Sequence, residues 1–416
     1  MTLLLASRLT ALFLWGASPN PSKEDASAPT GPRARTLGIT FGGQTGPLDA
    51  ITDVPGVEVG QVTLISGEGK RVVGEGPVRT GVTAVLPRGR ARVTESVFAA
   101  IHALNGSGEM TGSHWVGESG LLTGPVMLTN TNSVGAVRDA VVAWGVQHGA
   151  AWELGLPVVA ETYDGLLNDV DGFHVKAEHA WRAIDGASSG PVAEGNVGGG
   201  TGMTCHGFKC GIGTASRRLP EAMGGYTLGV LVQANYGRRS LFTVEGVPVG
   251  EELKDLQACY TGDTLPGSRF AQGMKPCAQR TEMSPRNASE GMGSIIVLVA
   301  TDAPLLPHQL GRIARRVPLA IGKMGGLGEN SSGDIFLAFS TQPVTPASSG
   351  QVAQVGSLDN ARLNPLFEAT VQATQEAILN ALLAARTQTG ADGVRVFALP
   401  HDRLLQAMRK YGRRAR

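Results

Sequence analysis

A serine between a polar loop and an apolar strand is the residue of this sequence best suited to do chemistry. Ser294 follows Gly293 and opens the run Ser-Ile-Ile-Val-Leu-Val-Ala at residues 294–300. A serine hydroxyl is a weak nucleophile unless a base takes its proton. If Ser294 became an N-terminus, its own α-amine, with an ordinary pKa of about 7.7–8.0, could be that base. The same pattern is also typical of an ordinary strand start, so the residues alone leave both interpretations open.

The residues around Ser294 suit a chain that cuts itself. Gly293 has no side chain to shield its carbonyl carbon, which Ser294 Oγ could attack to form an ester that water then opens. Upstream, residues 257–293 carry turn and loop signals without a sustained apolar pattern. Loops of this length are usually functional or disordered. Downstream, residues 294–300 are apolar on both faces, which is typical of a buried central strand.

Other polar residues follow other expected strands. Apolar runs predict strands over residues 51–62, entered by a turn, and over 81–86, 125–128, 158–161, 226–233 and 335–339. Tyr163 and Asn235 come just after two of these runs. Strand ends are where a rigid scaffold exposes functional groups. Helical spacing predicts helices from residue 136, over 308–321 and over 364–386. The alternation predicts sheets covered by helices.

The composition is that of a globular enzyme without an evident cofactor. The chain has 416 residues, 42% of them hydrophobic, which is ample for a large core. The 36 Lys and Arg nearly match the 35 Asp and Glu, so no excess charge attracts nucleic acid. The eight His lack zinc spacing, so no metal is expected. The glycine run at residues 198–202 lacks the Gly-Lys-Ser/Thr ending of a phosphate loop, which favours close packing over nucleotide binding.

The four cysteines fit either an oxidising or a reducing compartment. Cys205 and Cys210 flank a glycine-rich segment and are expected to be small buried hydrophobic residues. Cys259 and Cys277 bracket a polar loop, where an exported protein could form a disulfide. The sequence leaves that pairing open.

The N-terminus has the layout of a secretory signal. Arg8 precedes a short apolar run at residues 9–17, and a polar stretch rich in Pro and Ser continues to Arg35. The run is shorter than the roughly 20 residues that span a bilayer. We therefore expect residues 1–35 to be a signal and flexible leader, and the mature protein to be periplasmic or secreted rather than cytoplasmic and free of the membrane. A disordered leader with a chance apolar patch is the alternative.

Several motifs resemble one family in the same order along the chain. The junction Gly293–Leu305 resembles the cleavage site of the DmpA-like serine peptidases, which include L-aminopeptidase/D-esterases and beta-peptidyl aminopeptidases. Five further segments agree with that family, namely DVPGV at 53–57, ETYDG at 161–165, GNVGGGTGM at 195–203, VQANYG at 232–237 and SSGDIFLAFST at 331–341. The similarity extends over residues 37–401.

The resemblance implies a fold and a maturation step. The family fold is an α/β four-layer αββα sandwich that resembles N-terminal nucleophile hydrolases with altered connectivity. Self-cleavage would give an α chain at residues 36–293 and a β chain at residues 294–416, which stay together as a homo-oligomer of αβ pairs. The segment from 257 to 287 is longer than in typical members, so it could slow maturation, cover the substrate entrance or form a surface loop.

The resemblance also assigns roles to individual residues. Ser294 matches the nucleophile, and Asn235 matches a side chain that supports the oxyanion. Tyr163 matches a tyrosine that lines the same site, while Ser332, with Gly333 beside it, matches a second serine that orients or relays protons to the amine of the nucleophile. Asp334 stands where some members carry Glu. Each of these residues could instead form a turn, a cap or the edge of the core.

The sequence thus predicts an exported serine aminopeptidase or amidase that releases N-terminal residues from short peptides, amides or esters, possibly beta-peptidyl or D-amino acid substrates. Glu161 and Asp164 are candidates, by position only, to bind the substrate ammonium. One alternative is an acyltransferase resembling the ornithine acetyltransferases, although those carry Thr at the junction. The other is a non-catalytic relative that uses the fold for binding.

Overall fold

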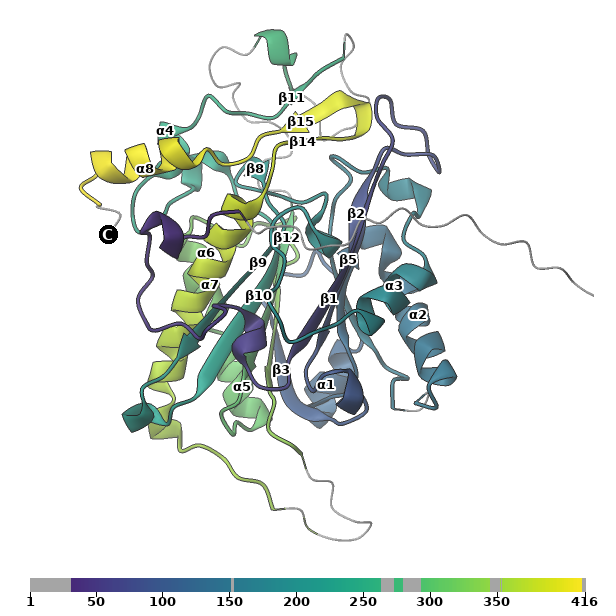
Figure 1. Cartoon of the computed structure of the whole chain (residues 1–416), viewed down its shortest axis with the longest axis vertical. Helices are drawn as coiled ribbons and strands as arrows, with labels where there is room; N and C mark the ends of the chain where they lie inside the picture. The colour runs from purple at the N-terminus through teal and green to yellow at the C-terminus, as the bar shows by residue number, and fades with distance from the viewer. Residues whose placement is uncertain are drawn as a thin grey trace, which may run out of the picture.

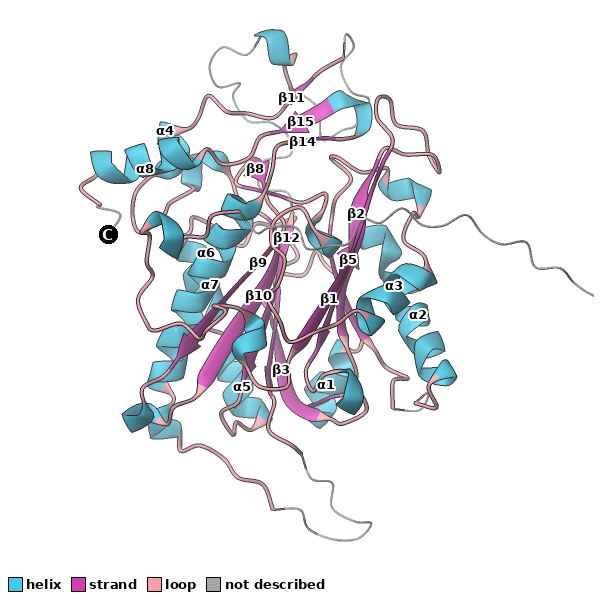
Figure 2. Cartoon of the chain, viewed as in Figure 1, coloured by secondary structure: helices cyan, strands magenta, loops and turns pink. Residues whose placement is uncertain are grey.

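Two β-sheets packed face to face form the centre of the molecule (Figures 1 and 2). This computed structural model describes residues 31–150, 153–262, 273–279, 293–344, 352 and 354–413. The first sheet has the order β1 (Glu58–Ser66), β2 (Val78–Leu86), β5 (Val126–Asn130) and β6 (Val158–Thr162). The second has the order β4 (Leu121–Leu122), β3 (Val97–Ala103), β13 (Ile335–Ser340), β12 (Ser294–Thr301), β10 (Thr227–Asn235) and β9 (Ile212–Arg218). Only the β5–β6 and β12–β13 pairs among these are parallel.

Helices cover the outer face of each sheet. On the first sheet lie α2 (Val134–Gln147) and α3 (Ala177–Asp185), at the right of Figure 1. On the second lie α5 (Pro307–Ala314) and the long α7 (Asn364–Ala384), and α6 (Val317–Lys323) packs against α7. The described part also contains α1 (Ser113–Ser119), α4 (Val249–Glu252) and α8 (His401–Lys410). The expected αββα order of layers is confirmed.

Three apolar cores fill the spaces between the four layers. Successive residues of a strand face opposite sides, so Val297 on β12 packs toward α7 while Leu298 packs toward the first sheet. The core between the sheets also contains Leu128 of the first sheet. Trp144 of α2 belongs to the third core, on the outer face of the first sheet. Every residue of β12 is buried, as its apolar sequence predicts.

Smaller strands close one end of the sandwich. These are the hairpin β7 (Thr204–Cys205) with β8 (Phe208–Lys209), and a small sheet ordered β11 (Cys259–Tyr260), β15 (Val394–Val396), β14 (Gln388–Thr389). Of the loop expected over 257–293, residues 263–272 and 280–292 lie outside the described part of the chain. Among the described helices, none is both long and apolar enough to cross a bilayer.

Three local expectations were wrong. The strand expected over residues 51–62 begins only at Glu58, because residues 51–53 form a 3-10 helix and a turn with Pro55, which has no N–H, follows it. The single helix predicted over 308–321 is two helices, α5 and α6, because Pro318 in the first turn of α6 has no N–H to continue the ladder of hydrogen bonds. Cys205 and Cys210 are buried as expected, but they form a disulfide with an S–S distance of 2.00 Å. Cys259 and Cys277 form a second disulfide, at 2.05 Å, which is the pairing that the sequence left open.

The first described residues belong to the fold. Arg33 Nε lies 2.9 Å from Glu194 Oε2, and the buried Ala34 donates its N–H to Asn380 Oδ1. Residues 33–35 are therefore part of the sandwich, and the flexible leader expected through residue 35 is too long by these residues. Residues 1–30, which carry the expected signal, lie outside the described residues.

Candidate active site

The junction lies at the start of β12, an interior strand of the second sheet that is flanked by β13 and β10. Ser294 is the first residue of β12 and pairs with Asn235, the last residue of the antiparallel β10. Gly293 has a φ of 152°, and a Cβ there would lie 1.9 Å from the carbonyl oxygen of Asn235 and 3.2 Å from Asn235 Nδ2. Only glycine fits this backbone. The amide group of Asn235 consequently lies beside the Gly293–Ser294 peptide.

The hydroxyl of Ser294 is held from the neighbouring parallel strand. The N–H of Gly333, just before β13, donates to Ser294 Oγ at 3.0 Å, and Ser294 is buried. Ser332 Oγ donates to Asp334 Oδ1 at 2.6 Å, and the N–H of Ile295 donates to the same oxygen at 3.2 Å. Burial raises the pKa of the Asp334 carboxyl. Ser294, Ser332, Gly333 and Asp334 thus lie together in one hydrogen-bonded cluster.

Asn105, which the sequence did not single out, holds Asp334 from two sides. The N–H of Asp334 donates to Asn105 Oδ1 at 2.6 Å, and Asn105 Nδ2 donates to Asp334 Oδ2 at 3.0 Å. Asn105 follows β3, the other neighbour of β13. The available signal was the polar, glycine-containing segment NGSGE at residues 105–109 after an apolar run, which is the same pattern that marked Tyr163 and Asn235.

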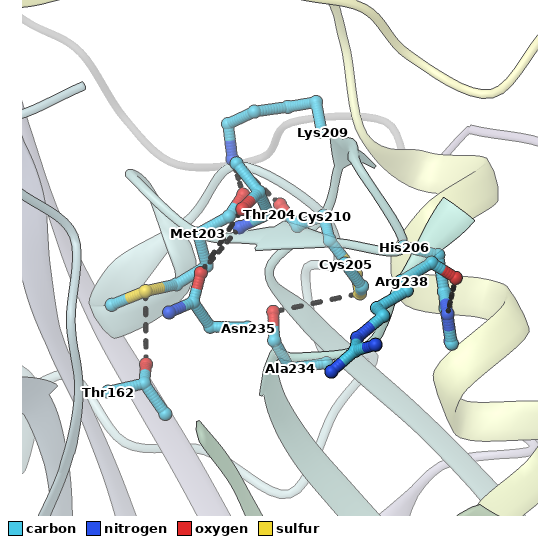
Figure 3. Close-up of a disulfide and its surroundings, with 10 residues drawn as sticks. All are labelled: Thr162, Met203, Thr204, Cys205, His206, Lys209, Cys210, Ala234, Asn235 and Arg238. Atoms are coloured by element: carbon cyan, nitrogen blue, oxygen red, sulfur yellow. Dashed lines mark hydrogen bonds between the residues drawn. A yellow bond between two sulfur atoms is a disulfide. The ribbon is translucent and has the colours of Figure 1, made fainter. Parts of the chain in front are cut away.

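The Asn235 side chain is held at both ends. Asn235 Oδ1 accepts the N–H of Thr204 at 2.8 Å (Figure 3). Asn235 Nδ2 donates to the backbone carbonyl of Tyr163 at 2.8 Å. An amide nitrogen carries two hydrogens, so the second hydrogen of Nδ2 can serve an oxyanion. Tyr163 thereby joins the site through its backbone, while its hydroxyl lies against Gly165, where an added Cβ would approach it to 2.3 Å.

The two acidic candidates at the end of β6 differ in their surroundings. Glu161 Oε1 accepts the N–H of Glu109 at 3.1 Å, and its other oxygen accepts the hydroxyl of Thr131. The segment that carries Glu109 touches the nucleophile cluster, because a Cβ on Gly108 would lie 2.8 Å from the Cα of Gly333. Burial raises the pKa of Glu161. The segment that contains Gly108 and Glu109 therefore connects Glu161 to the cluster around Ser294.

Asp164, in contrast, is a fully buried structural group. Asp164 Oδ2 accepts from Asn130 Nδ2 and Oδ1 from Asn168 Nδ2, both at 3.1 Å. Burial raises its pKa to about 6. These contacts occupy the carboxylate within the protein. Elsewhere in the described residues, no group of three or more His, Cys, Asp or Glu is arranged to hold a metal ion.

Comparison with known proteins identifies the class of this site. The chain matches peptidase family S58 over residues 49–396. It is 54% identical to a beta-peptidyl aminopeptidase of Sphingosinicella microcystinivorans over 393 residues, covering 94% of this chain and 95% of that protein. The structure is similar to a Burkholderia sp. beta-aminopeptidase, with a TM-score of 0.78, 46% identity and coverage of 92% of this chain and 99% of the other.

A second solved structure relates the fold to a wider class. The L-aminopeptidase D-Ala-esterase/amidase of Ochrobactrum anthropi, described as a prototype of the serine aminopeptidases and a new variant of the Ntn hydrolase fold, matches with a TM-score of 0.78 and 43% identity. Coverage is 92% of this chain and 99% of that one. The chain therefore belongs to peptidase family S58. It is an aminopeptidase, a hydrolase acting on peptide bonds, and the comparisons favour this function over the acyltransferase alternative.

Proposed function

We propose that the chain cuts itself between Gly293 and Ser294 and that the mature enzyme is an aminopeptidase with Ser294 as its N-terminal nucleophile. One observation carries the proposal. The Ser294 hydroxyl accepts the N–H of Gly333 while the side chain of Asn235, opposite in the sheet, lies against the junction. A nucleophile and an oxyanion donor thus flank the same peptide bond, as acyl transfer requires.

Self-cleavage follows from this arrangement as an acyl shift. Ser294 Oγ attacks the Gly293 carbonyl carbon, the O–C bond forms, and the C–N bond breaks as the hydroxyl proton passes to the leaving nitrogen. The Asn235 amide stabilises the transient oxyanion. Water then hydrolyses the ester, leaving a carboxylate on Gly293 and a free amine and hydroxyl on Ser294.

Turnover repeats the same chemistry on a substrate. The Ser294 amine takes the hydroxyl proton, the hydroxyl forms an acyl-enzyme, and the amine passes the proton to the leaving amine; water completes the hydrolysis. Asp334 and Ser332 are well situated to orient that amine, because Asp334 Oδ1 lies within hydrogen-bond distance of the next amide, Ile295 N. The pKa of an ordinary α-amine, about 7.7–8.0, suits a base near neutral pH.

An aminopeptidase must bind the ammonium of its substrate, and Glu161 is the better of the two acidic candidates. Its neighbours, Thr131 and the Glu109 N–H, are neutral donors, so its negative charge is not neutralised by a cation there. Asp164 is enclosed by Asn130 and Asn168. Because the relative that is 54% identical is a beta-peptidyl aminopeptidase, we propose short peptides or amides with an N-terminal β-amino acid as the substrate class.

We further propose that the enzyme is exported and assembles as a homo-oligomer of αβ pairs. Arg8 and the apolar residues 9–17 support export, as do the two disulfides, because disulfides persist in oxidising compartments. The family resemblance alone supports the oligomer. Intact mass of the secreted protein would report the mature N-terminus, and light scattering would report the oligomer.

Replacement of the nucleophile tests the proposed function. Ser294→Ala should remain a single uncut chain and lose hydrolysis of a β-homoamino acid p-nitroanilide by at least about 10⁴-fold. Ser66→Ala, at an exposed position of β1, should mature and act as wild type. N-terminal sequencing of wild-type fragments should detect Ser-Ile-Ile-Val. An active Ser294→Ala protein, or a wild-type enzyme that works uncut, would refute the mechanism.

A further inference from the structure

The β7–β8 hairpin lies across the end of β10 and contacts the residue that flanks the junction (Figure 3). Thr204 of β7 donates its N–H to Asn235 Oδ1 at 2.8 Å, and His206 in the turn donates its N–H to the Tyr236 carbonyl at 2.8 Å. The Thr204 N–H fixes the oxygen end of the Asn235 amide, because only that end can accept a hydrogen bond, while the Tyr163 carbonyl fixes the nitrogen end at 2.8 Å.

Two internal links close this hairpin. The disulfide joins Cys205 in β7 to Cys210 just after β8, and both residues are fully buried. Lys209 is also fully buried, and its Nζ donates to the carbonyls of Met203 at 2.6 Å and Cys210 at 2.8 Å. Met203 and Cys210 lie on either side of the hairpin, so both links hold its two ends together. Neither link takes part in the mechanism described above.

The position of the Thr204 N–H influences which way the Asn235 amide points its N–H donor toward the oxyanion. If the hairpin moved, the Asn235 oxygen would lose the donor that holds it, and the amide would be held only through its nitrogen, by the Tyr163 carbonyl. The amide could then tilt about its last torsion and aim its free N–H less well at the developing negative charge. Removal of one oxyanion donor costs about 10²–10³ in kcat in other hydrolases. Donors must already be in position when charge develops, so a support for Asn235 would influence catalysis without touching the substrate.

We infer that the Cys205–Cys210 disulfide and Lys209 form a positioning unit that orients Asn235 as the oxyanion donor. The inference rests on the proposed function of Asn235. It adds the β7–β8 hairpin, which lies outside the nucleophile cluster, to the parts of the chain that influence catalysis. It assigns to this disulfide a role in catalysis that the second disulfide, Cys259–Cys277, does not share, because the latter fastens β11 to a 3-10 helix at Cys277–Gln279.

Two double variants test the inference and serve as controls for each other. Cys205→Ala/Cys210→Ala should lower kcat by about tenfold or more with little change in KM, and should weaken binding of an aminoacyl boronate, a tetrahedral transition-state analogue, by the same factor. Cys259→Ala/Cys277→Ala should keep wild-type kcat and boronate affinity. A KM effect alone, or equal losses in both variants, would overturn the proposal, since general destabilisation predicts no selective loss of transition-state binding.

A second measurement covers the case in which the first variant does not fold or mature. Lys209→Met keeps the disulfide and the aliphatic chain but removes both hydrogen bonds, and the same loss of kcat and boronate affinity is expected. Cys205→Ala/Cys210→Ala or Lys209→Met could fold, as judged by circular dichroism, and yet remain uncut. If the Cys259→Ala/Cys277→Ala protein matures in the same experiment, that result supports a role of the hairpin in self-cleavage. If every folded hairpin variant matures and turns over like wild type, the proposal is wrong.

The test separates this inference from the proposed function. A wild-type enzyme that is never cut or has no hydrolytic activity would refute the function itself. An active wild type with indifferent hairpin variants would refute only the role of the hairpin.

Discussion

At the scale of single residues, Glu161 and Asp164 show how their neighbours distinguish two buried carboxyl groups. Glu161→Gln removes the charge proposed to attract the substrate ammonium and keeps the shape of the side chain. We expect KM for a β-homoamino acid p-nitroanilide to rise about 10–100-fold, because an amide cannot replace the charge-assisted contact, with a smaller change in kcat. Steady-state kinetics over a range of substrate concentrations measure both. An unchanged KM would show that the ammonium binds elsewhere.

Asp164→Asn is the matched control for that experiment. KM should stay within about twofold of wild type, and the change should appear in stability instead. Because burial raises the pKa of Asp164 from 3.8 to about 6, the folded state holds the proton more tightly than the unfolded state. Wild-type stability should therefore fall as the pH rises from about 4 to about 6. That slope should be weaker in Asp164→Asn.

Asn105 is expected to act through Asp334. Asn105→Ala removes the Nδ2 donor to Asp334 Oδ2 and the acceptor of the Asp334 N–H. Loss of a donor to a carboxylate raises its pKa, so the acidic limb of the kcat/KM profile should move to higher pH, and the loss of activity should be larger at pH 6 than at pH 8. Asn196→Ala is the control, because Asn196 holds the backbone of Arg386 in the same two-sided way. A uniform loss at every pH would indicate a purely structural role.

Some of these residues could be predicted from the sequence and others could not. Asn235 and Tyr163 end apolar runs, and Ser294 begins one, so each was visible as a polar residue beside a strand. Asn105 also follows a strand, but its partner Asp334 is far along the chain, and only the pairing of β3 with β13 brings them together. Likewise, the disulfide between Cys205 and Cys210 depends on the hairpin turn between them, which a glycine-rich sequence does not specify.

At the scale of elements, α7 is fastened to the second sheet by a buried ion pair. Arg217 of β9 donates to Glu376 of α7 at 2.6 Å, and the side chains are 1% and 0% exposed. Arg35 also lies 2.8 Å from Glu376. Glu376→Gln would leave Arg217 buried with its charge poorly compensated, so we expect a loss of about 3–5 kcal/mol in the free energy of unfolding.

Urea denaturation of the uncut Ser294→Ala chain measures this loss, since a single chain avoids fragment dissociation. Glu368→Gln, at an exposed position of the same helix, should change stability by less than about 0.5 kcal/mol. A small effect of Glu376→Gln would mean that water or neighbouring groups compensate Arg217. The sequence predicted α7 itself from its helical spacing, but not this ion pair, because Glu376 and Arg217 are joined only by the packing of the two layers.

At the scale of the whole molecule, the proposed cut creates two chains that cannot separate without unfolding. The new β chain would begin with β12 and β13, which lie side by side in the second sheet between β10 and β3 of the α chain. Both disulfides join residues that precede the cut, so neither disulfide would link the two chains. The fragments should part on a denaturing gel without reductant and yet elute as one species in native buffer.

Refolding tests this interleaved architecture most directly. Because strands of one chain must enter the middle of a sheet formed by the other, mature enzyme diluted from urea should recover activity at a rate that rises with protein concentration. The uncut Ser294→Ala chain should regain its circular dichroism at a rate independent of concentration, as a unimolecular reaction. If the mature enzyme also refolds independently of concentration, then its two chains either remain associated in urea or were never separated by the cut, and intact mass spectrometry under denaturing conditions distinguishes these cases.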